Sequence, residues 1–176
     1  MELRHWKQSD AMELTSMCNA VDRHYLSDRL PNPYTEKDAE EWLKMVTDND
    51  AMTGIYRAIV CDGKLIGSIS VEKKNDDAEI GYMLLNEYTN KGIATEAVKQ
   101  ICTIAFKVLS LEQIMANVFQ PNIASMRVLL KNDFKYKGVI PNAVIKDGNV
   151  YDLLIYVLTV NRDIQLMRLK GGSSTC

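Results

Sequence analysis

The spacing of hydrophobic residues along the chain alternates between a helical and a strand-like period. Apolar positions recur every three or four residues in several segments, which predict helices over about residues 9–19, 35–47, 93–109 and 121–132. Runs rich in β-branched and aromatic residues predict strands at 3–6, 55–61, 64–71, 77–85, 113–119, 134–139, 144–146 and 150–160. Both periods in one chain predict a protein of mixed helix and sheet.

Turn and capping residues mark where several of these elements begin and end. Thr35 and Asp38 have the spacing of a capping box, in which each side chain bonds a backbone N–H at the start of a helix. Asp62-Gly63 and Asp147-Gly148 each separate two strand-like runs, and this dipeptide is typical of tight hairpin turns. We therefore expect an antiparallel meander over 55–85 and a second hairpin near Asp147.

The order of the elements favours an α+β fold over a regularly alternating one. The strand at 113–119 directly follows the long helix over 93–109, which predicts a β-α-β crossover. The prediction is a mixed, mostly antiparallel β-sheet with this central β-α-β unit and flanking helices. We expect a single domain over 1–169 and a flexible tail over 170–176.

Composition and charge narrow the classes of protein and partner. Of the 176 residues, 47% are hydrophobic and 25% are charged, which excludes collagen, coiled coils and disordered chains. The net charge of −2 argues against non-specific nucleic-acid binding. The N-terminus lacks the apolar run of a signal peptide, and no run approaches about 18 apolar residues, so we expect a cytoplasmic protein with no membrane partner.

The cysteines predict neither a metal site nor a disulfide framework. Cys18, Cys61, Cys102 and Cys176 are far apart, and no Cys/His cluster has zinc spacing, so we expect no metal. Cys61 and Cys102 lie in apolar runs, which predict small core residues with free thiols.

Two segments carry candidate chemistry, and the first joins the strand at 77–85 to the long helix. It reads Tyr88-Thr-Asn-Lys-Gly-Ile-Ala-Thr-Glu-Ala97. A glycine here lets an anion approach the backbone, where free N–H groups and the positive end of the helix dipole bind phosphate. Since the chain has no P-loop and no GxGxxG motif, the alternative is an ordinary helix start with a permissive glycine.

The second segment begins the helix over 121–132. Asn122 and Ser125 are three residues apart, so both project from one helix face near its start. The alternative is that Asn122 only caps the helix and that Ser125 is solvated.

Together the two segments resemble the GNAT superfamily of acetyl-CoA-dependent N-acetyltransferases, and most of all its ribosomal-protein serine/alanine N-terminal branch. The resemblance covers about residues 3–160. It rests on the order and spacing of Pro33-Tyr-Thr35, Ala78-Glu-Ile-Gly-Tyr-Met83, Lys91-Gly-Ile-Ala-Thr-Glu-Ala97, Asn122-Ile-Ala-Ser125 and Lys131-Asn-Asp-Phe134. It implies the GNAT-like fold and acetyl transfer from acetyl-CoA to a primary amine.

The resemblance also implies where acetyl-CoA binds. The family's glycine-rich turn falls on Thr89-Asn-Lys-Gly-Ile-Ala94, where Thr89 replaces a Gln or Arg and Lys91 is the candidate replacement charge. The backbone groups implied to hold the diphosphate are those of Asn90, Lys91, Gly92, Ile93, Ala94 and Thr95. The strand residues implied to pair with pantetheine are Met83, Leu84 and Leu85.

The second segment supplies most of the implied catalytic groups. Asn122 is implied to hold pantetheine, and Ser125 to protonate the departing CoA thiolate, because the tyrosine that many relatives use is Leu129 here. Asp133 replaces the glycine that usually precedes the phenylalanine. Acids on the strand at 77–85 serve as bases in similar enzymes, so Glu79 is the candidate base, with a solvated carboxylate as the alternative.

The acceptor is expected to meet the early helices, the loop over 28–35 and the hairpin over 141–150. Acids in these helices and this loop attract a cationic amine or are merely solvated; they are Asp22, Asp28, Glu36 and Asp38. The sequence does not choose between a protein N-terminus and a small amine.

Alternatives remain for the acid–base groups and for the function. His5, His24, Tyr82 and Tyr156 are less favoured acid–base candidates than Glu79 and Ser125. A non-catalytic sensor that binds acyl-CoA is the alternative function. No association signal chooses between a monomer and a homodimer.

Overall fold

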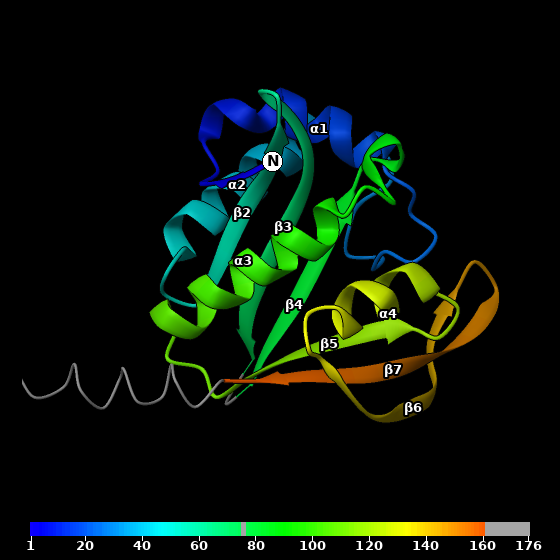
Figure 1. The fold of residues 1–176 in the computed structure, drawn as a ribbon. Coiled ribbons are helices and arrows are strands. Elements are labelled where there is room, and N and C mark those ends of the chain that lie inside the picture. Colours follow the sequence, from blue (N-terminus) through cyan, green and yellow to red (C-terminus); the bar gives the residue numbers. More distant parts are fainter. Residues whose placement is uncertain (75–76, 161–176) are drawn as a thin grey trace, which may run out of the picture.

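A computed structural model describes residues 1–74 and 77–160, whose strands form one mixed sheet in the order β1-β2-β3-β4-β5-β7-β6 (Figure 1). The strands are β1 (Glu2–Arg4), β2 (Gly54–Cys61), β3 (Lys64–Lys74), β4 (Asp77–Leu84), β5 (Gln113–Phe119), β6 (Lys135–Lys146) and β7 (Asn149–Thr159). The helices are α1 (Ala11–Ala20), α2 (Glu36–Asn49), α3 (Ile93–Val108) and α4 (Ile123–Leu130), with short 3₁₀ turns η1 (Gln8–Asp10) and η2 (Asn86–Tyr88). Among the strand pairs of the described residues, only that of β4 and β5 is parallel, which confirms the predicted α+β fold with its central β-α-β unit.

The predicted capping and turn residues set the ends of several elements. The Thr35 hydroxyl accepts a hydrogen bond from the Asp38 N–H (3.2 Å), and the Asp38 carboxylate accepts one from the Thr35 N–H (2.8 Å), so α2 begins with the predicted capping box. Asp62-Gly63 and Asp147-Gly148 turn their hairpins with all four φ angles positive, between 49° and 78°.

The sheet is covered on both faces, and β4 contributes side chains to both cores. Alternate residues of β4, including Ile80 and Tyr82, pack into the core beneath α3, and Met83 packs toward the core beneath α1 and α2. This alternation fixes which residues of β4 can face which side of the sheet.

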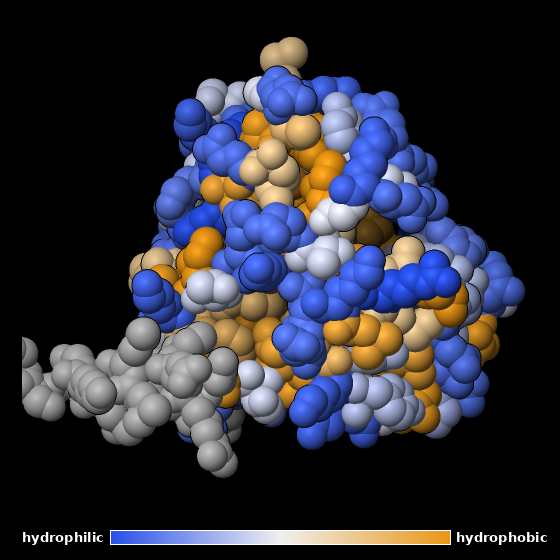
Figure 2. Space-filling view, in the orientation of Figure 1, coloured by the Kyte–Doolittle hydropathy of each residue, from blue (hydrophilic) through white to orange (hydrophobic). Residues whose placement is uncertain are grey.

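The C-terminal part of the sheet differs from the sequence-based expectation. The two short strands expected at 134–139 and 144–146 are one strand, β6, with register shifts at Tyr136/Gly138 and Ile140/Val144. These irregularities interrupt the alternation of hydrophobic residues, which is why the sequence predicts two short strands here. Apolar side chains gather over β6 and α4 in the space-filling view (Figure 2), and those that are exposed include Ile123, Leu130 and Ile145.

The predicted burial of the cysteines is confirmed for only one of the two expected core positions. Cys102 is buried as expected, but Cys61 is half-buried because it ends β2 beside the hairpin turn, and Cys18 is buried in the other core. The expected tail over 170–176 lies outside the described residues. None of the helices in the described ranges is long and apolar enough to cross a membrane.

Candidate active site

The candidate site is built around a gap between β4 and β5. The two strands are in register at a single pair, Glu79 and Met115, and then diverge (Figure 1). Two side-chain hydrogen bonds join the strands at the closed end: Gln113 Nε2 donates to Asp77 Oδ1 (2.6 Å), and Asn117 Nδ2 donates to Glu79 Oε1 (3.1 Å). In Figure 2 the surface is hollowed between α4 on one side and the segment after β4 on the other, so the open end of the gap reaches the surface.

The backbone of β4 offers hydrogen-bonding groups to this gap. The Leu85 N–H donates to the Ile66 carbonyl of β3 (2.9 Å). Since backbone N–H groups point to alternate sides along a strand, those of Tyr82 and Leu84 point toward β5. Of the three residues expected to pair with pantetheine, Met83 directs its backbone groups to β3 and Leu84 directs its groups into the gap, while the Leu85 N–H bonds β3 and its carbonyl accepts from the Tyr88 N–H (2.9 Å).

The turn before α3 presents a row of free N–H groups. Asn90 and Gly92 have φ angles of +58° and +78°, and this left-handed backbone turns the chain into the helix. No backbone N–H from Asn90 to Thr95 donates to another described residue, and the first to do so is that of Glu96, which bonds the Gly92 carbonyl (3.1 Å). A Cβ at Gly92 would meet nothing within 4 Å, so the space beside this residue is open. Six free donors at the positive end of a 16-residue helix suit a diphosphate.

Two lysines flank this turn. Lys91 Nζ and Lys64 Nζ lie 5.4 Å and 5.6 Å from the centroid of the Tyr88 ring, and Lys64 also pairs with Glu87 (2.9 Å). The Thr89 hydroxyl donates to the Asn86 carbonyl (2.8 Å) within η2, so it is used locally. Lys91 is therefore the cationic side chain within the turn, two residues after Thr89, where the family pattern has a Gln or Arg.

The start of α4 brings a hydroxyl pair to the α3 side of the gap. The Asn122 side-chain oxygen caps the helix by accepting from the Ser125 N–H (3.1 Å), and its Nδ2 donates no hydrogen bond to another described residue. Ser125 Oγ lies 2.8 Å from Tyr82 Oη. Burial raises the pKa of Tyr82 to about 12, although the hydrogen bond with Ser125 opposes the increase, so this phenol stays protonated at neutral pH.

The rest of α4 is anchored in ways that explain two departures from the family pattern. Leu129 is fully buried in the core, so its position presents no group to the gap. Asp133 has a φ of +62°, a left-handed conformation after the helix end that glycine adopts most easily. Asn132 Nδ2 donates to the Thr95 carbonyl (3.1 Å), which ties the end of α4 to the start of α3.

Glu79 lies at the closed end of the gap and on the other face of β4 from Tyr82. One carboxylate oxygen pairs with Lys74 and the other accepts from Asn117 (3.1 Å). Each oxygen keeps a second lone pair and the side chain is 26% exposed, so Glu79 can accept a proton directly or through a water molecule. Glu79 and Ser125 thus flank the gap from opposite faces of the sheet.

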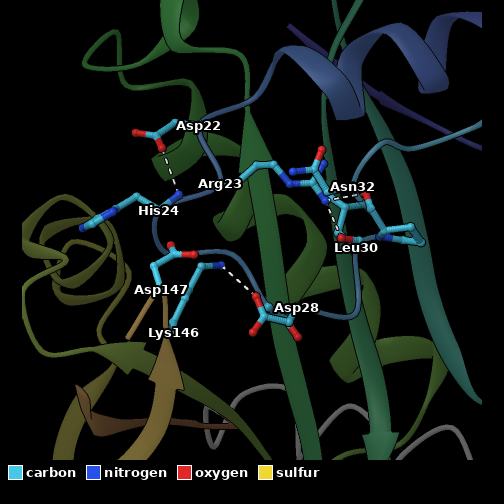
Figure 3. A pocket seen from close by; sticks show the side chains of 10 residues that line it. Asp22, Arg23, His24, Asp28, Leu30, Asn32, Lys146 and Asp147 are labelled. Atoms are coloured by element: carbon cyan, nitrogen blue, oxygen red, sulfur yellow. Dashed lines mark hydrogen bonds and ion pairs between the residues drawn. The ribbon is translucent and has the colours of Figure 1, made fainter. Parts of the chain in front are cut away.

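A cavity of about 480 Å³ lies between the 22–32 loop and the β6–β7 turn (Figure 3). Its cations are already bonded: Arg23 donates to the carbonyls of Cys18, Leu30 and Pro31, and Lys146 pairs with Asp28 (3.2 Å). Next to it, the rings of His24, Tyr25, Phe119 and Tyr151 contact one another, with centroids 4.4 to 6.4 Å apart, and join this loop to the ends of β5 and β7.

The structure brings together some of the predicted acceptor residues and separates others. Asp22 and Asp28 line the cavity, as Figure 3 shows, but Glu36 and Asp38 lie at the start of α2 and do not line it. His5 pairs with Asp50 (3.0 Å) on the β1 side of the sheet, away from the gap. Among the described residues, no three His, Cys, Asp or Glu side chains gather closely enough to hold a metal ion.

Sequence reasoning did not detect the hydrogen bonds that place Ser125 and Glu79. Tyr82 is 43 residues from Ser125, and Asn117 is 38 residues from Glu79. Neither pair has a local spacing signal, because each depends on how β4 lies against β5 and α4.

Comparison with known proteins gives consistent matches. Residues 1–135 match the family described as "Acetyltransferase (GNAT) domain". The putative ribosomal N-acetyltransferase YdaF of Bacillus subtilis is 30% identical over 128 residues, which are 71% of this chain and 68% of that protein. The uncharacterized N-acetyltransferase YoaA of the same organism is 35% identical over 103 residues, 57% of this chain and 58% of YoaA, so that match spans less than two thirds of the relative.

The solved structures agree with the observed fold. RimL, a ribosomal L7/L12 α-N-protein acetyltransferase in complex with coenzyme A, superposes with a TM-score of 0.81 at 18% identity, covering 90% of this chain and 93% of RimL. A probable acetyltransferase superposes with a TM-score of 0.80 at 26% identity, covering 92% of this chain and 93% of that one.

Proposed function

The chain belongs to the GNAT acetyltransferase family, and on this premise we propose that it transfers an acetyl group from acetyl-CoA to a primary amine. The observation that carries the proposal is the row of six free N–H groups from Asn90 to Thr95 beside the open end of the β4–β5 gap. An anion-binding turn beside a narrow gap suits a ligand with a diphosphate at one end and an extended arm at the other.

Several groups of the chain would hold the coenzyme. The turn and Lys91 bind the diphosphate, and the arm lies in the gap, where the Leu84 backbone and the free Asn122 amide supply hydrogen bonds. The Leu84 or Tyr82 N–H, which points into the gap, can polarise the thioester carbonyl. Bound acetyl-CoA supplies the acetyl group as a thioester.

The acceptor amine approaches from the α1/α2 face, on the side of Glu79 and the cavity. Attack requires the neutral amine, so Glu79 takes one proton from the ammonium group through water and passes it to solvent, and it takes a second proton from the nitrogen as the amide forms. The new N–C bond forms as the C–S bond breaks, and Ser125, on the α3 side, gives its proton to the departing thiolate. The two roles are separated by the sheet, so one acetylation uses groups from both faces in a ternary complex.

The acceptor class is the second part of the proposal. YdaF is named a putative ribosomal N-acetyltransferase and RimL an α-N-protein acetyltransferase. A cavity of about 480 Å³ beside an aromatic cluster has room for a few residues of an extended peptide. We therefore propose a protein N-terminus that begins with Ser or Ala as the acceptor.

The test is release of free CoA thiol when the protein is mixed with acetyl-CoA and a panel of amines. The panel contains peptides with N-terminal Ser or Ala, the same peptides with a blocked N-terminus, a polyamine and an aminoglycoside. We expect thiol release with the free N-terminal peptides and none with the blocked ones. CoA binding without thiol release from any amine would identify a sensor instead, and no CoA binding would refute both functions.

A further inference from the structure

The hydroxyl of Tyr82 has no role in the mechanism above, yet it makes the one side-chain hydrogen bond that Ser125 Oγ has within the described residues. The Oη–Oγ distance is 2.8 Å, and the two residues come from β4 and from the start of α4. Ser125 is held at a second point, where its N–H donates to Asn122 Oδ1 (3.1 Å). The backbone and the hydroxyl of this serine are therefore both fixed.

We propose that Tyr82 is a positioning residue, which donates its phenolic proton to Ser125 Oγ and so leaves the serine proton free to point at the CoA sulfur. This inference rests on the proposed acetyl transfer. A serine hydroxyl has one proton, and it is misdirected if it is given to Tyr82. The opposite polarity, with the phenol as donor, leaves the serine oxygen as acceptor and its proton available. Of the two hydroxyls the phenol is the more acidic and the better donor.

The surroundings of Tyr82 favour this polarity and exclude a charged alternative. The ring packs in the core beneath α3, so its position is set by the fold and not by the ligand. Burial raises the pKa of Tyr82 to about 12, and a phenol with that pKa keeps its proton across the working range. Linked hydroxyls polarise one another, which strengthens the outer donor.

The proton balance of the step follows directly. The acceptor nitrogen loses two protons as the ammonium becomes an amide, both through Glu79 and water to solvent, and the thiolate sulfur gains the Ser125 proton as the C–S bond breaks. The Ser125 oxygen, still bonded by the Tyr82 O–H, regains a proton from solvent. Tyr82 transfers no proton in this scheme and only orients the donor.

The inference also accounts for the missing tyrosine of the family pattern. Leu129 is fully buried and offers no proton. Tyr82 supplies a phenol from the opposite wall of the gap, and this phenol acts on the serine and not on the sulfur. The site thus has a phenolic hydroxyl beside Ser125, though it belongs to β4 instead of α4.

The experiment removes this hydroxyl with Tyr82→Phe, which keeps the ring and its packing. We expect kcat to fall about fivefold to tenfold, the size of one lost neutral hydrogen bond, while the Kd for CoA stays within twofold by calorimetry. Tyr136→Phe is the matched control, because Tyr136 is exposed on β6 and lies outside the gap; it should leave kcat unchanged.

A double-mutant cycle separates positioning from a merely structural role. If Tyr82 acts through Ser125, then Tyr82→Phe lowers kcat in the wild-type background but has no further effect in Ser125→Ala. The Tm of the same four proteins without CoA reports the hydrogen bond itself. Coupling in kcat supports the inference. Coupling in Tm without coupling in kcat shows a structural contact only, and overturns it.

The pH profile gives a further readout. Because Tyr82 stays protonated, the ratio of wild-type to Tyr82→Phe kcat should be constant from pH 6 to 9, and a ratio that changes with pH would refute the orienting role. A wild-type enzyme that releases thiol at the same rate as Tyr82→Phe refutes this inference alone. A wild-type enzyme that acetylates no amine refutes the proposed function, and this inference with it.

Discussion

Replacing Glu79 with glutamine tests the proposed base. The change removes the charge and keeps the side-chain length, so an amide oxygen can still accept the hydrogen bond from Asn117. The carboxylate also pairs with Lys74, but these side chains are 26% and 44% exposed. A half-exposed ion pair contributes under about 1 kcal/mol to stability, so we expect the variant to fold normally.

The expected effect on catalysis is larger than the effect on folding. Loss of a general base lowers kcat by about a hundredfold, or about 2.7 kcal/mol of transition-state stabilisation. This catalytic loss is larger than the stability that the ion pair contributes, so the role of Glu79 in catalysis can be told apart from its role in folding.

The assay follows thiol release from acetyl-CoA at saturating acceptor between pH 6 and 9. Glu72→Gln is the matched control, because Glu72 is the direct cross-strand neighbour of Glu79 on β3 and shares its face of the sheet. We expect the control to retain wild-type rates. Glu79 would be excluded as the base if its variant kept a kcat within fivefold of wild type.

Three further predictions concern the phosphate turn, the cap of α2 and a buried thiol. Gly92→Ala should raise the CoA Kd at least tenfold, since a side chain at φ +78° strains the turn and enters the open space beside Gly92. The control is Gly148→Ala, at φ +77° and outside the turn before α3. It should lower the free energy of unfolding by a similar amount, about 1 kcal/mol, and leave the Kd for CoA unchanged in calorimetry. Equal Kd values for both variants would contradict the phosphate assignment. Thr35→Ala removes the cap of α2 and should cost about 1 kcal/mol in chemical unfolding with kcat unchanged; no loss would mean that the capping box carries no net stability. Burial raises the pKa of the Cys102 thiol to about 12, above its unfolded value near 9, so its stabilisation is complete below pH 9 and is lost as pH rises toward 12. Between pH 9 and 10 the free energy of unfolding of the wild type should fall as pH rises. Cys102→Ala should make this slope shallower by up to about 1.4 kcal/mol per pH unit, and an unaltered slope would contradict the prediction.

The sequence predicted the elements whose signals are local. The capping box at Thr35 and the Asp-Gly turns formed as expected, because each depends only on a few neighbouring residues. The strand β5 was placed without error, and the ends of α3 differed by one residue at the C-terminus. Short-range hydrogen bonding determines the cap and the turns, and the pattern of apolar residues along the chain locates β5 and α3.

The candidate site was predictable only as a list of residues. The motifs identified the turn before α3 and the start of α4, and the structure places both beside one gap. The gap itself depends on the divergence of two strands, and the Tyr82–Ser125 contact depends on packing between distant segments. Hydrophobic periodicity carries no information about either, because a splayed strand and a paired strand have the same alternation.

The single register pair between β4 and β5 also divides the sheet mechanically. Strands β1 to β4 form one ladder, and β5, β7 and β6 form another, so few backbone hydrogen bonds hold the two half-sheets together. A pantetheine arm bonded to both sides of the gap would replace the hydrogen bonds that β4 and β5 do not make with each other. Acetyl-CoA then becomes a structural part of the fold as well as its substrate, and amide hydrogen exchange in the half-sheet of β5, β6 and β7 should slow as the coenzyme concentration rises.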